Sequence, residues 1–425
     1  MRILQIRPTP AIAFATVLTR IILKSPSNIK EGNEAIILEF SAKKSQNSSK
    51  FIKGHFGMVY VSTKKRQERR MIYAVDLFAG AGGFSQAARD IGIHVVAAVE
   101  NNPNACKTYR SNLIEGCPCP TKLFENDITQ LPPAEFINSA GLEPFSVDIL
   151  MGGPPCQGFS THRINNAGVD DPRNALILQY FSYLKALKPK SFVVENVPGL
   201  LWPRHESYLN KFYSLAAEAG YEIFAPQVIN AKDYGVPQNR KRVFILGFRN
   251  NIPGNLQWPP QPTHFAPESK EVLDDGLPAW RPASDVFSLP VAPDDPNNIC
   301  MHHTPEMVKV FESTPLNGGS RHQSGRVLPC HRKHNGHKDV YGRVDPSKPG
   351  PTMTTACINP SKGRFLHPTE HHGISVRHAA RFQTFPEDFV FHGGLMASGI
   401  QVGNAVPIRL GRAVLASVVG ALEKF

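Results

Sequence analysis

The sequence predicts an α/β fold in which helices wind doubly around a mostly parallel sheet, with a smaller, loop-rich second domain. First, short apolar segments alternate with helical segments from residue 71 to about residue 262, the pattern of a doubly wound sheet. Second, apolar residues in these segments follow one another almost without interruption instead of alternating with polar ones, as in strands that are buried on both faces. Third, this pattern ends where ten prolines fall between residues 251 and 300, because proline removes backbone hydrogen-bond donors.

The composition is that of a folded protein of two or three domains, with 41% of the 425 residues hydrophobic and 19% charged. The longest apolar run, Ala11–Leu23, has 13 residues and contains Arg20, so no run reaches the roughly 20 residues that span a bilayer. Seven cysteines in so long a chain favour a reducing compartment over a disulfide framework. A net charge of +12 favours a polyanionic partner such as nucleic acid.

The first 70 residues differ from the rest of the chain. Residues 1–30 contain five basic residues and no acidic one, which resembles a targeting segment, but no clear cleavage site follows the apolar run. Met71 opens the first expected strand, so a translation start at Met71 is the alternative interpretation. In both cases we expect the fold to begin at Met71.

The expected strands of the sheet are Tyr73–Phe78, His94–Glu100, Val147–Met151, Ser191–Glu195 and Arg242–Phe248. A helix is expected within Arg173–Leu187, because Ile177, Phe181 and Leu184 repeat on one helical face. Residues 300–375 are rich in His, Gly and basic residues and show little helical period. The last 50 residues return to helix and strand patterns.

These patterns divide the chain into four parts. They are an extension at residues 1–70, the α/β domain at 71–262, the second domain at 263–394 and a segment at 395–425 that returns to the α/β domain.

The segment YAVDLFAGAGGF begins with the first expected strand and continues into a glycine-rich turn and a helix start. Gly80, Gly82 and Gly83 allow a sharp turn and the close approach of a ligand. Glu100 ends the next strand, 20 residues after Gly80, where a carboxylate can accept both hydroxyls of a ribose. The pattern fits NAD and S-adenosylmethionine equally, but Ser85 replaces the third glycine of the dinucleotide fingerprint, which disfavours NAD.

The segment GGPPCQGFS follows the third expected strand, and its cysteine is Cys156. Ligand sites of α/β sheets lie at this carboxyl edge. An inert cysteine in the core is the usual alternative, but two prolines before Cys156 and a glycine after it argue against burial in a regular element. We therefore favour a nucleophilic thiolate.

Two further strand ends carry charge. Glu195 closes the apolar segment SFVVE, where desolvation raises the pKa of a carboxyl and lets it hold a proton near neutral pH. Arg240 and Arg242 in QNRKR alternate onto one side of an extended chain, which suits bidentate contacts to carboxylate, phosphate or base. A surface acid and a solvated basic edge are the plainer alternatives.

Six segments follow one another along the chain in this order: FAGAGGF, PPCQGFS, ENV, QNRKR, RFQTFP and QVGNAVP. This order resembles the DNA (cytosine-5)-methyltransferase family, of the compact prokaryotic type, from about Met71 to the C-terminus except in a variable region. The resemblance implies a Rossmann-like, S-adenosylmethionine-dependent methyltransferase domain and a smaller target-recognition domain.

The resemblance also implies a set of residues around S-adenosylmethionine, the methyl donor. They are Phe78, Gly80, Gly82, Glu100, Asp127, Asn404 and Val406. In this family pattern Glu100 binds the ribose hydroxyls, Asp127 accepts a hydrogen bond from the adenine amino group, and Asn404 and Val406 close the pocket.

The residues implied at the target cytosine are Pro154, Cys156, Glu195, Arg240 and Arg242. The thiolate of Cys156 attacks carbon 6, which makes carbon 5 nucleophilic toward the methyl group, and Glu195 contacts the ring nitrogen and amino group. The arginines support this site. The cytosine must be flipped out of the duplex, and the chemistry requires no metal.

The residues expected to contact DNA are Gln157, Ser160, Arg321, Arg326, Arg332 and Lys333. The stretch from residue 321 to 338 contains no acid, and its basic side chains suit phosphates and guanine edges. A solvated basic loop is the alternative. The expected partner is double-stranded DNA, bound by a monomer without a membrane, and the resemblance allows a cognate restriction endonuclease. The expected location is the cytoplasm, with the nucleoid, in a prokaryote or the nucleus in a eukaryote.

Three other functions were compared with this interpretation. A related branch methylates cytosine in tRNA, but QGFS after Cys156 is similar to the DNA-acting enzymes. A catalytically inactive, DNA-binding regulatory subunit would not need the full set of Cys156, Glu195, Arg240 and Arg242. An NAD oxidoreductase is disfavoured by PPCQ and the missing glycine.

Two groups of cysteine and histidine could bind a metal. Cys106, Cys117 and Cys119 lack a clear fourth ligand, so a loop is favoured. The second group lacks a familiar finger spacing, and its members are Cys300, His302, His303, Cys330, His331 and His334. We expect no metal.

Overall fold

The structure is a computed structural model, and it describes residues 70–155, 175–250, 256–324 and 339–423. Residues 71–425 form one compact unit. Its sheet consists of β1 Ile72–Leu77, β2 Ile93–Glu100, β3 Lys122–Glu125, β4 Ile149–Gly152, β5 Ser191–Asn196, β6 Tyr221–Ile223, β7 Gln227–Asn230 and β8 Lys241–Arg249. The strand order is β3-β2-β1-β4-β5-β8-β6, and β7 also pairs with β8.

The sheet is mostly parallel. The pairs β1–β2, β2–β3, β1–β4 and β4–β5 are parallel, whereas β8 runs antiparallel to β5, β6 and β7. The carboxyl ends of β1, β2, β4 and β5 therefore lie along one edge of the sheet, together with the start of β8. The predicted doubly wound, mostly parallel sheet is confirmed.

Three strands were not predicted: β3, β6 and β7, of three or four residues each. β3 is exposed at both ends, and all three lie on the margins of the sheet. A marginal strand needs no continuous apolar run, so an apolar pattern does not reveal it. The five predicted strands all form, with ends within two residues of those expected.

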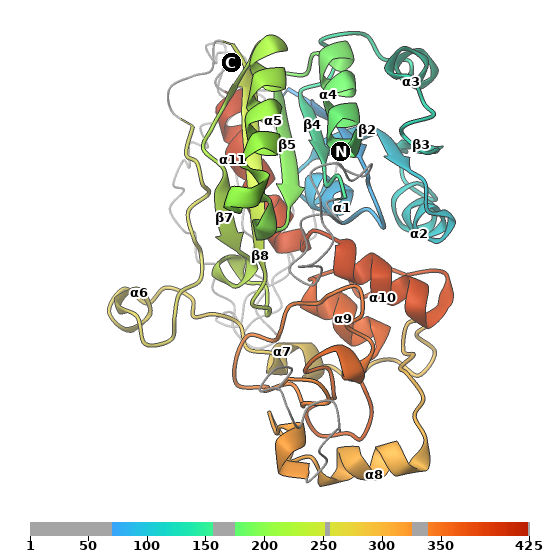
Figure 1. Cartoon of the computed structure of the whole chain (residues 1–425), viewed down its shortest axis with the longest axis vertical. Coiled ribbons are helices and arrows are strands. Elements are labelled where there is room, and N and C mark those ends of the chain that lie inside the picture. The colour runs from blue at the N-terminus through green and yellow to red at the C-terminus, as the bar shows by residue number, and fades with distance from the viewer. Residues whose placement is uncertain (1–69, 156–174, 251–255, 325–338, 424–425) are drawn as a thin grey trace, which may run out of the picture. The chain divides into compact units, whose positions relative to one another are not determined.

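Helices cover both faces of the sheet (Figure 1). The helices of the α/β part are α1 Gly83–Asp90, α2 Pro103–Leu113, α3 Pro133–Ala140, α4 Ala175–Leu187 and α5 Glu206–Glu218. One core cluster joins β1, β4 and β8 to α1 and α11 Ile408–Leu422, and a second joins the opposite strand faces to α3, α4 and α5. The alternation of strand side chains explains this division, because successive residues face opposite sides.

The rest of the described chain is irregular and carries short helices. They are α6 Lys270–Leu273, α7 Ser284–Phe287, α8 Pro305–Ser313, α9 Val376–Phe382 and α10 Gly394–Asn404. The core cluster on the α1 side continues into this part through Val344, Met353 and Phe365. The expected strand pattern near the C-terminus is wrong for the described residues 376–423, which form only α9, α10 and α11 with their links.

The segment Gly394–Leu422 is long and apolar enough to cross a membrane by length and composition alone. It consists of two separate helices, because Pro407 follows α10 and removes a backbone donor at the junction. In addition, 61% of its most apolar window is buried inside the structure. Packing of α11 on α1 and the sheet accounts for its apolar residues.

Candidate active site at the carboxyl edge of the sheet

The glycine-rich turn after β1 is shaped by packing and leaves an opening. Gly80 and Gly82 have φ angles of 56° and 89°, in the left-handed region. A Cβ on Gly82 would lie 2.3 Å from Cδ1 of Leu113, and one on Gly83 would lie 2.8 Å from the carbonyl oxygen of Val406. At Gly80, by contrast, nothing lies within 4 Å of such an atom. The space beside Gly80 is therefore open to a ligand.

Glu100 is held directly beside this opening. Its Oε2 accepts a hydrogen bond from the backbone N–H of Gly80 at 2.8 Å, and its Oε1 accepts one from that of Asn102 at 2.7 Å. Each carboxylate oxygen can accept a further hydrogen bond. The carboxylate is thus fixed at the end of β2 and keeps capacity for a ligand hydroxyl.

Asp127 lies two residues after β3, the strand that pairs with the end of β2. Its side chain is exposed, and Oδ1 accepts hydrogen bonds from the backbone N–H and hydroxyl of Thr129. The structure therefore brings Asp127 and Glu100 to the same edge of the sheet.

The remaining residues expected at the donor pocket also lie near this turn. Phe78 follows β1 with a φ of 59°, which is unusual for a residue other than glycine and is often found at ligand sites. Asn404 is exposed at the end of α10, and the backbone of Val406 packs against Gly83. The C-terminal segment thus forms a wall of the turn.

A buried acid beneath the turn was missed by the sequence reasoning. Asp76 of β1 accepts a 2.6 Å hydrogen bond from the hydroxyl of Ser85, which accepts one of 2.8 Å from the hydroxyl of Tyr109. Burial raises the pKa of Asp76 to about 7, and the charge of Glu100 adds to this. The network ties β1 to α1 and α2, and it explains the serine in place of glycine. An acid inside an apolar strand was the available signal.

The second half of the site lies at the ends of β5 and β8. Glu195 is buried, and its Oε1 lies 2.9 Å from Nε of Arg242. The N–H is not aligned for a hydrogen bond, and Oε1 has no other donor among the described residues. Burial raises the pKa of Glu195 above its usual range, against the opposing charges of Arg242 and Arg240. A buried carboxyl with free hydrogen-bonding capacity can bind or protonate a ligand.

The loop that leads to Cys156 runs along this carboxyl. A Cβ on Gly153 would lie 3.2 Å from Oε2 of Glu195. The carbonyl of Pro154, which is buried, accepts a 3.1 Å hydrogen bond from the side chain of Asn196. Asn196 is a second residue that sequence reasoning missed. Cys156 itself lies outside the described residues.

Arg240 differs from its expected role. Its side chain is 0% exposed and donates hydrogen bonds to the backbone carbonyls of Met353, Gly403 and Ala405. The expected bidentate contact to a carboxylate, phosphate or base is wrong for Arg240, because the side chain is buried and its Nη1 and Nη2 bind these carbonyls, while Nε has no partner among the described residues. Arg242 alone pairs with Glu195.

Arg321 is also placed differently from the expectation. It begins the short 3-10 helix η6 Arg321–Ser324 and is 1% exposed, so its guanidinium cannot reach a DNA backbone unless its surroundings move. The other residues expected to contact DNA lie outside the described residues, and they are Gln157, Ser160, Arg326, Arg332 and Lys333.

Two cysteines in the described residues, Cys106 and Cys357, are buried, whereas Cys119 is exposed. Cys106 is buried, and its thiol donates to the carbonyl of Glu100 at 3.4 Å. Burial raises the pKa of Cys106 to about 12. Within the described ranges, no group of three or more His, Cys, Asp or Glu side chains is arranged to hold a metal ion. Three members of the second group considered above, Cys330, His331 and His334, lie outside those ranges.

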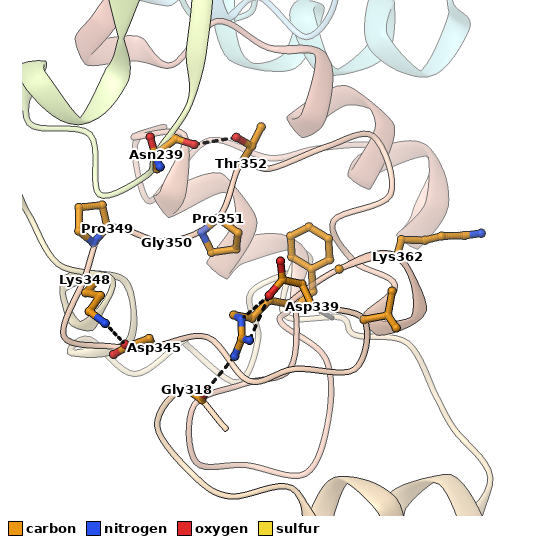
Figure 2. A pocket seen from close by; sticks show the side chains of 14 residues that line it. Asn239, Gly318, Asp339, Asp345, Lys348, Pro349, Gly350, Pro351, Thr352 and Lys362 are labelled. Carbon is orange, nitrogen blue, oxygen red and sulfur yellow. Dashed lines mark hydrogen bonds and ion pairs between the residues drawn. The ribbon is translucent and has the colours of Figure 1, made fainter. Parts of the chain in front are cut away.

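A pocket of about 750 Å³ lies where Asn239, just before β8, meets residues between 318 and 365 (Figure 2). At its rim the hydroxyl of Thr352 donates a 2.7 Å hydrogen bond to the carbonyl of Asn239. Lys348 and Arg364 line it, but they pair with Asp345 and Asp339. Two of its three basic side chains are therefore neutralised, the third being Lys362, and neither Glu100 nor Glu195 lines the pocket.

Comparison with known proteins shows to which family the chain belongs. A model of the family described as C-5 cytosine-specific DNA methylase matches residues 72–420. The chain belongs to this family. The resemblance drawn from the six segments and the enzyme class it implied, a DNA (cytosine-5)-methyltransferase, are thereby confirmed, and an NAD oxidoreductase is excluded.

Individual relatives agree with this membership in the DNA methylase family. The type II methyltransferase M1.HphI of Haemophilus parahaemolyticus is 31% identical over 346 residues, which are 81% of this chain and 86% of that protein. M.Sau96I of Staphylococcus aureus is 32% identical over 356 residues, 82% of this chain and 76% of that protein. A solved structure described as a DNA modification methyltransferase encoded within an E. coli prophage shares the fold, with a TM-score of 0.62 at 23% identity over 83% of this chain and 99% of that one.

Proposed function

We propose that this DNA methylase transfers the methyl group of S-adenosylmethionine to carbon 5 of a flipped-out cytosine, within a specific duplex sequence, through a covalent adduct on Cys156. The observation that carries the proposal is the buried carboxyl of Glu195, which lies beside Gly153 on the loop that leads to Cys156. The opening at Gly80 and Glu100 lies at the same sheet edge, because β1, β2, β4 and β5 are parallel.

The residues at the glycine turn fit S-adenosylmethionine, which when bound supplies a methyl group activated by its sulfonium. The opening at Gly80 admits the donor close to the backbone. Glu100 keeps acceptor capacity for ribose hydroxyls although both its oxygens are already bound to backbone N–H groups. Asp127 and Asn404 are exposed at this edge and are proposed to bind the adenine end and to close the pocket.

Cys156 and Glu195 are proposed to activate the base together. The sulfur of Cys156 forms a bond to carbon 6, and the displaced electron pair moves toward the ring nitrogen, where the proton held by Glu195 stabilises it. Carbon 5 then takes up the methyl group, and the electron pair of the broken sulfur–methyl bond stays with the donor, which leaves as S-adenosylhomocysteine. A base from the solvent takes the carbon 5 proton, and the electron pair of that C–H bond re-forms the double bond to carbon 6 and expels the thiolate. The proton at the ring nitrogen returns to Glu195. Arg242, whose Nε lies 2.9 Å from Oε1 of Glu195, holds this carboxyl in place.

The second domain, residues 263–394, is proposed to hold the duplex against this edge and to read its sequence. The target atom is inaccessible inside a base pair, so the cytosine must leave the stack. Type II methyltransferases among the relatives suggest a cognate restriction endonuclease as a functional partner. A monomer in the cytoplasm, associated with the nucleoid, is the state proposed for such an enzyme.

Bisulfite sequencing of DNA from cells that express the protein tests the proposal. We expect methylated cytosine in one sequence context with the wild type and none with Cys156→Ser, because a serine hydroxyl stays protonated near neutral pH. In parallel, purified protein is offered duplex DNA and tRNA with labelled S-adenosylmethionine. Label in tRNA and none in duplex DNA would contradict the proposal.

A further inference from the structure

A buried polar network joins three segments that are far apart in the sequence. Its side chains belong to Gln238, Arg240 and Gln383, and all three are 0% exposed. Gln238 accepts a hydrogen bond from the backbone N–H of Met353 at 2.7 Å and donates to Gln383 at 2.9 Å. Gln383 in turn donates to the carbonyls of Val402 and Ala405. Every side-chain nitrogen and oxygen of these three residues is hydrogen-bonded within the described part of the chain, except Nε of Arg240. Because buried hydrogen bonds of this kind are costly to break, the network fixes the geometry around it.

Arg240 is the charged centre of this network. Its Nη1 donates to the carbonyl of Met353 at 2.6 Å, and its Nη2 donates to the carbonyls of Gly403 at 2.9 Å and Ala405 at 3.0 Å. Within the described ranges no carboxylate lies in ion-pair distance of this buried guanidinium. Its charge is therefore held by carbonyl dipoles, whose positions it fixes in return.

One of the carbonyls that Arg240 binds, that of Ala405, lies next to the wall of the proposed donor pocket. Ala405 precedes Val406, whose carbonyl oxygen lies against the glycine turn at Gly83. A Cβ on Gly83 would also lie 3.2 Å from Cβ of Ala405. A shift of this link would therefore move the wall of the turn that opens at Gly80.

Arg240 is also close in sequence to the proposed base site. Arg242 follows two residues later on β8 and pairs with Glu195. The third bond of Arg240, to Met353, reaches the second domain. In Figure 1, α9 and α10 lie between the sheet and the part that carries α7 and α8. One side chain thus connects the donor wall, the strand of the base site and the second domain.

We propose that Arg240 is a positioning residue that couples binding of the methyl donor to binding of DNA. The inference rests on the proposed function, since it takes S-adenosylmethionine and DNA as the two ligands. DNA held by the second domain acts on Met353, and Arg240 transmits the restraint to the Gly403–Ala405 link and so to the donor pocket. By reciprocity, the bound donor favours the DNA-binding arrangement by the same factor.

The test compares Arg240→Lys with a matched arginine. Arg343 is also 0% exposed and donates to the carbonyls of Phe311, Thr314 and His367, all within the second domain. Arg343→Lys therefore disturbs a buried arginine without touching the donor wall. Gln383→Leu removes a different hydrogen-bond donor to the carbonyl of Ala405, and this variant tests the same link if Arg240→Lys does not fold.

The ligand titrated is S-adenosylhomocysteine, which is what remains of the donor after methyl transfer and cannot react during the measurement. Isothermal titration calorimetry measures its affinity for the protein with and without duplex DNA that carries the methylated site. For the wild type we expect DNA to tighten binding about tenfold, a typical coupling between two sites. For Arg240→Lys and Gln383→Leu we expect affinity without DNA to fall about tenfold and the effect of DNA to approach one. Arg343→Lys should retain wild-type affinity without DNA.

The outcomes separate the two proposals. If the wild type binds no S-adenosylhomocysteine, the proposed function is wrong. If it binds, but DNA has no effect on its affinity, or Arg240→Lys or Gln383→Leu keeps the full effect, the coupling through Arg240 is refuted while the function stands. Equal losses in Arg240→Lys and Arg343→Lys would likewise refute it, because they would show general destabilisation.

Discussion

Replacing Arg242 with methionine should destabilise the protein more at pH 8 than at pH 5. The change leaves the buried carboxyl of Glu195 without its ion-pair partner. Burial already raises the pKa of Glu195, and the charge of Arg242 opposes that rise, so the pKa should rise further in the variant. A carboxyl whose pKa is raised in the folded state contributes stability below its unfolded pKa, and this stability is lost as pH rises through the folded pKa.

The size of the effect follows from the geometry. At 2.9 Å, two unit charges attract by about 6 kcal/mol at an effective dielectric constant of about 20. Desolvation offsets part of this attraction, and the side chains of Arg242 and Glu195 are 14% and 10% exposed. Breaking such a nearly buried pair costs about 3 kcal/mol when the remaining partner is charged. At pH 5 the carboxyl can take up a proton instead, so most of that loss should disappear.

Urea unfolding at pH 5 and pH 8 measures this difference. Arg242→Met should lose about 3 kcal/mol at pH 8. Adding Glu195→Gln should recover much of the loss, because no buried charge then remains. Lys185→Met removes one side of the exposed pair with Glu218 and should cost less than about 1 kcal/mol at both pH values. Equal destabilisation of Arg242→Met at the two pH values, without rescue by Glu195→Gln, would refute the reasoning.

Three further predictions concern other parts of the chain. A protein that starts at Met71 should fold and methylate DNA, since every motif follows that residue; an insoluble or inactive product would show that the extension is integral. Alanine at both Arg332 and Lys333 should weaken DNA binding and reduce its dependence on salt in fluorescence anisotropy, and unchanged affinity and site preference would indicate a solvated loop. Burial lowers the pKa of His367 to about 4 and that of His378 to about 3, so stability should fall as pH drops below 6.5 toward 4; a thermal melting temperature that is flat over this range would contradict this.

Local patterns in the sequence predicted the parts of the fold that depend on local physics. The central strands are buried on both faces, so their apolar runs mark them directly. The turn requires glycines because Gly80 and Gly82 have left-handed backbone conformations and because a side chain at Gly82 or Gly83 would clash with neighbouring atoms. The short strands β3, β6 and β7 escaped because marginal positions tolerate polar residues.

Tertiary contacts explain what the sequence could not predict. Arg240 bonds to carbonyls 113 to 165 residues away, and nothing in QNRKR distinguishes such a buried arginine from an exposed one. Arg321 looked like part of a basic surface but is buried in the structure. The bond from Ser85 to Asp76 joins residues only nine positions apart, yet it depends on α1 packing over β1. The roles of the individual site residues stay predictions.

The covalent step through Cys156 is tested most directly with duplex DNA that contains 5-fluorocytosine at the target position. Fluorine cannot leave carbon 5 as a proton does, so the wild type, supplied with S-adenosylmethionine, should remain covalently bound to DNA after methyl transfer. The complex should resist denaturation, and peptide mapping should place it on Cys156. Cys119→Ser, which alters an exposed cysteine, should still form it, whereas Cys156→Ser should not. A complex mapped to any other cysteine, or full methylation by Cys156→Ser, would contradict the mechanism.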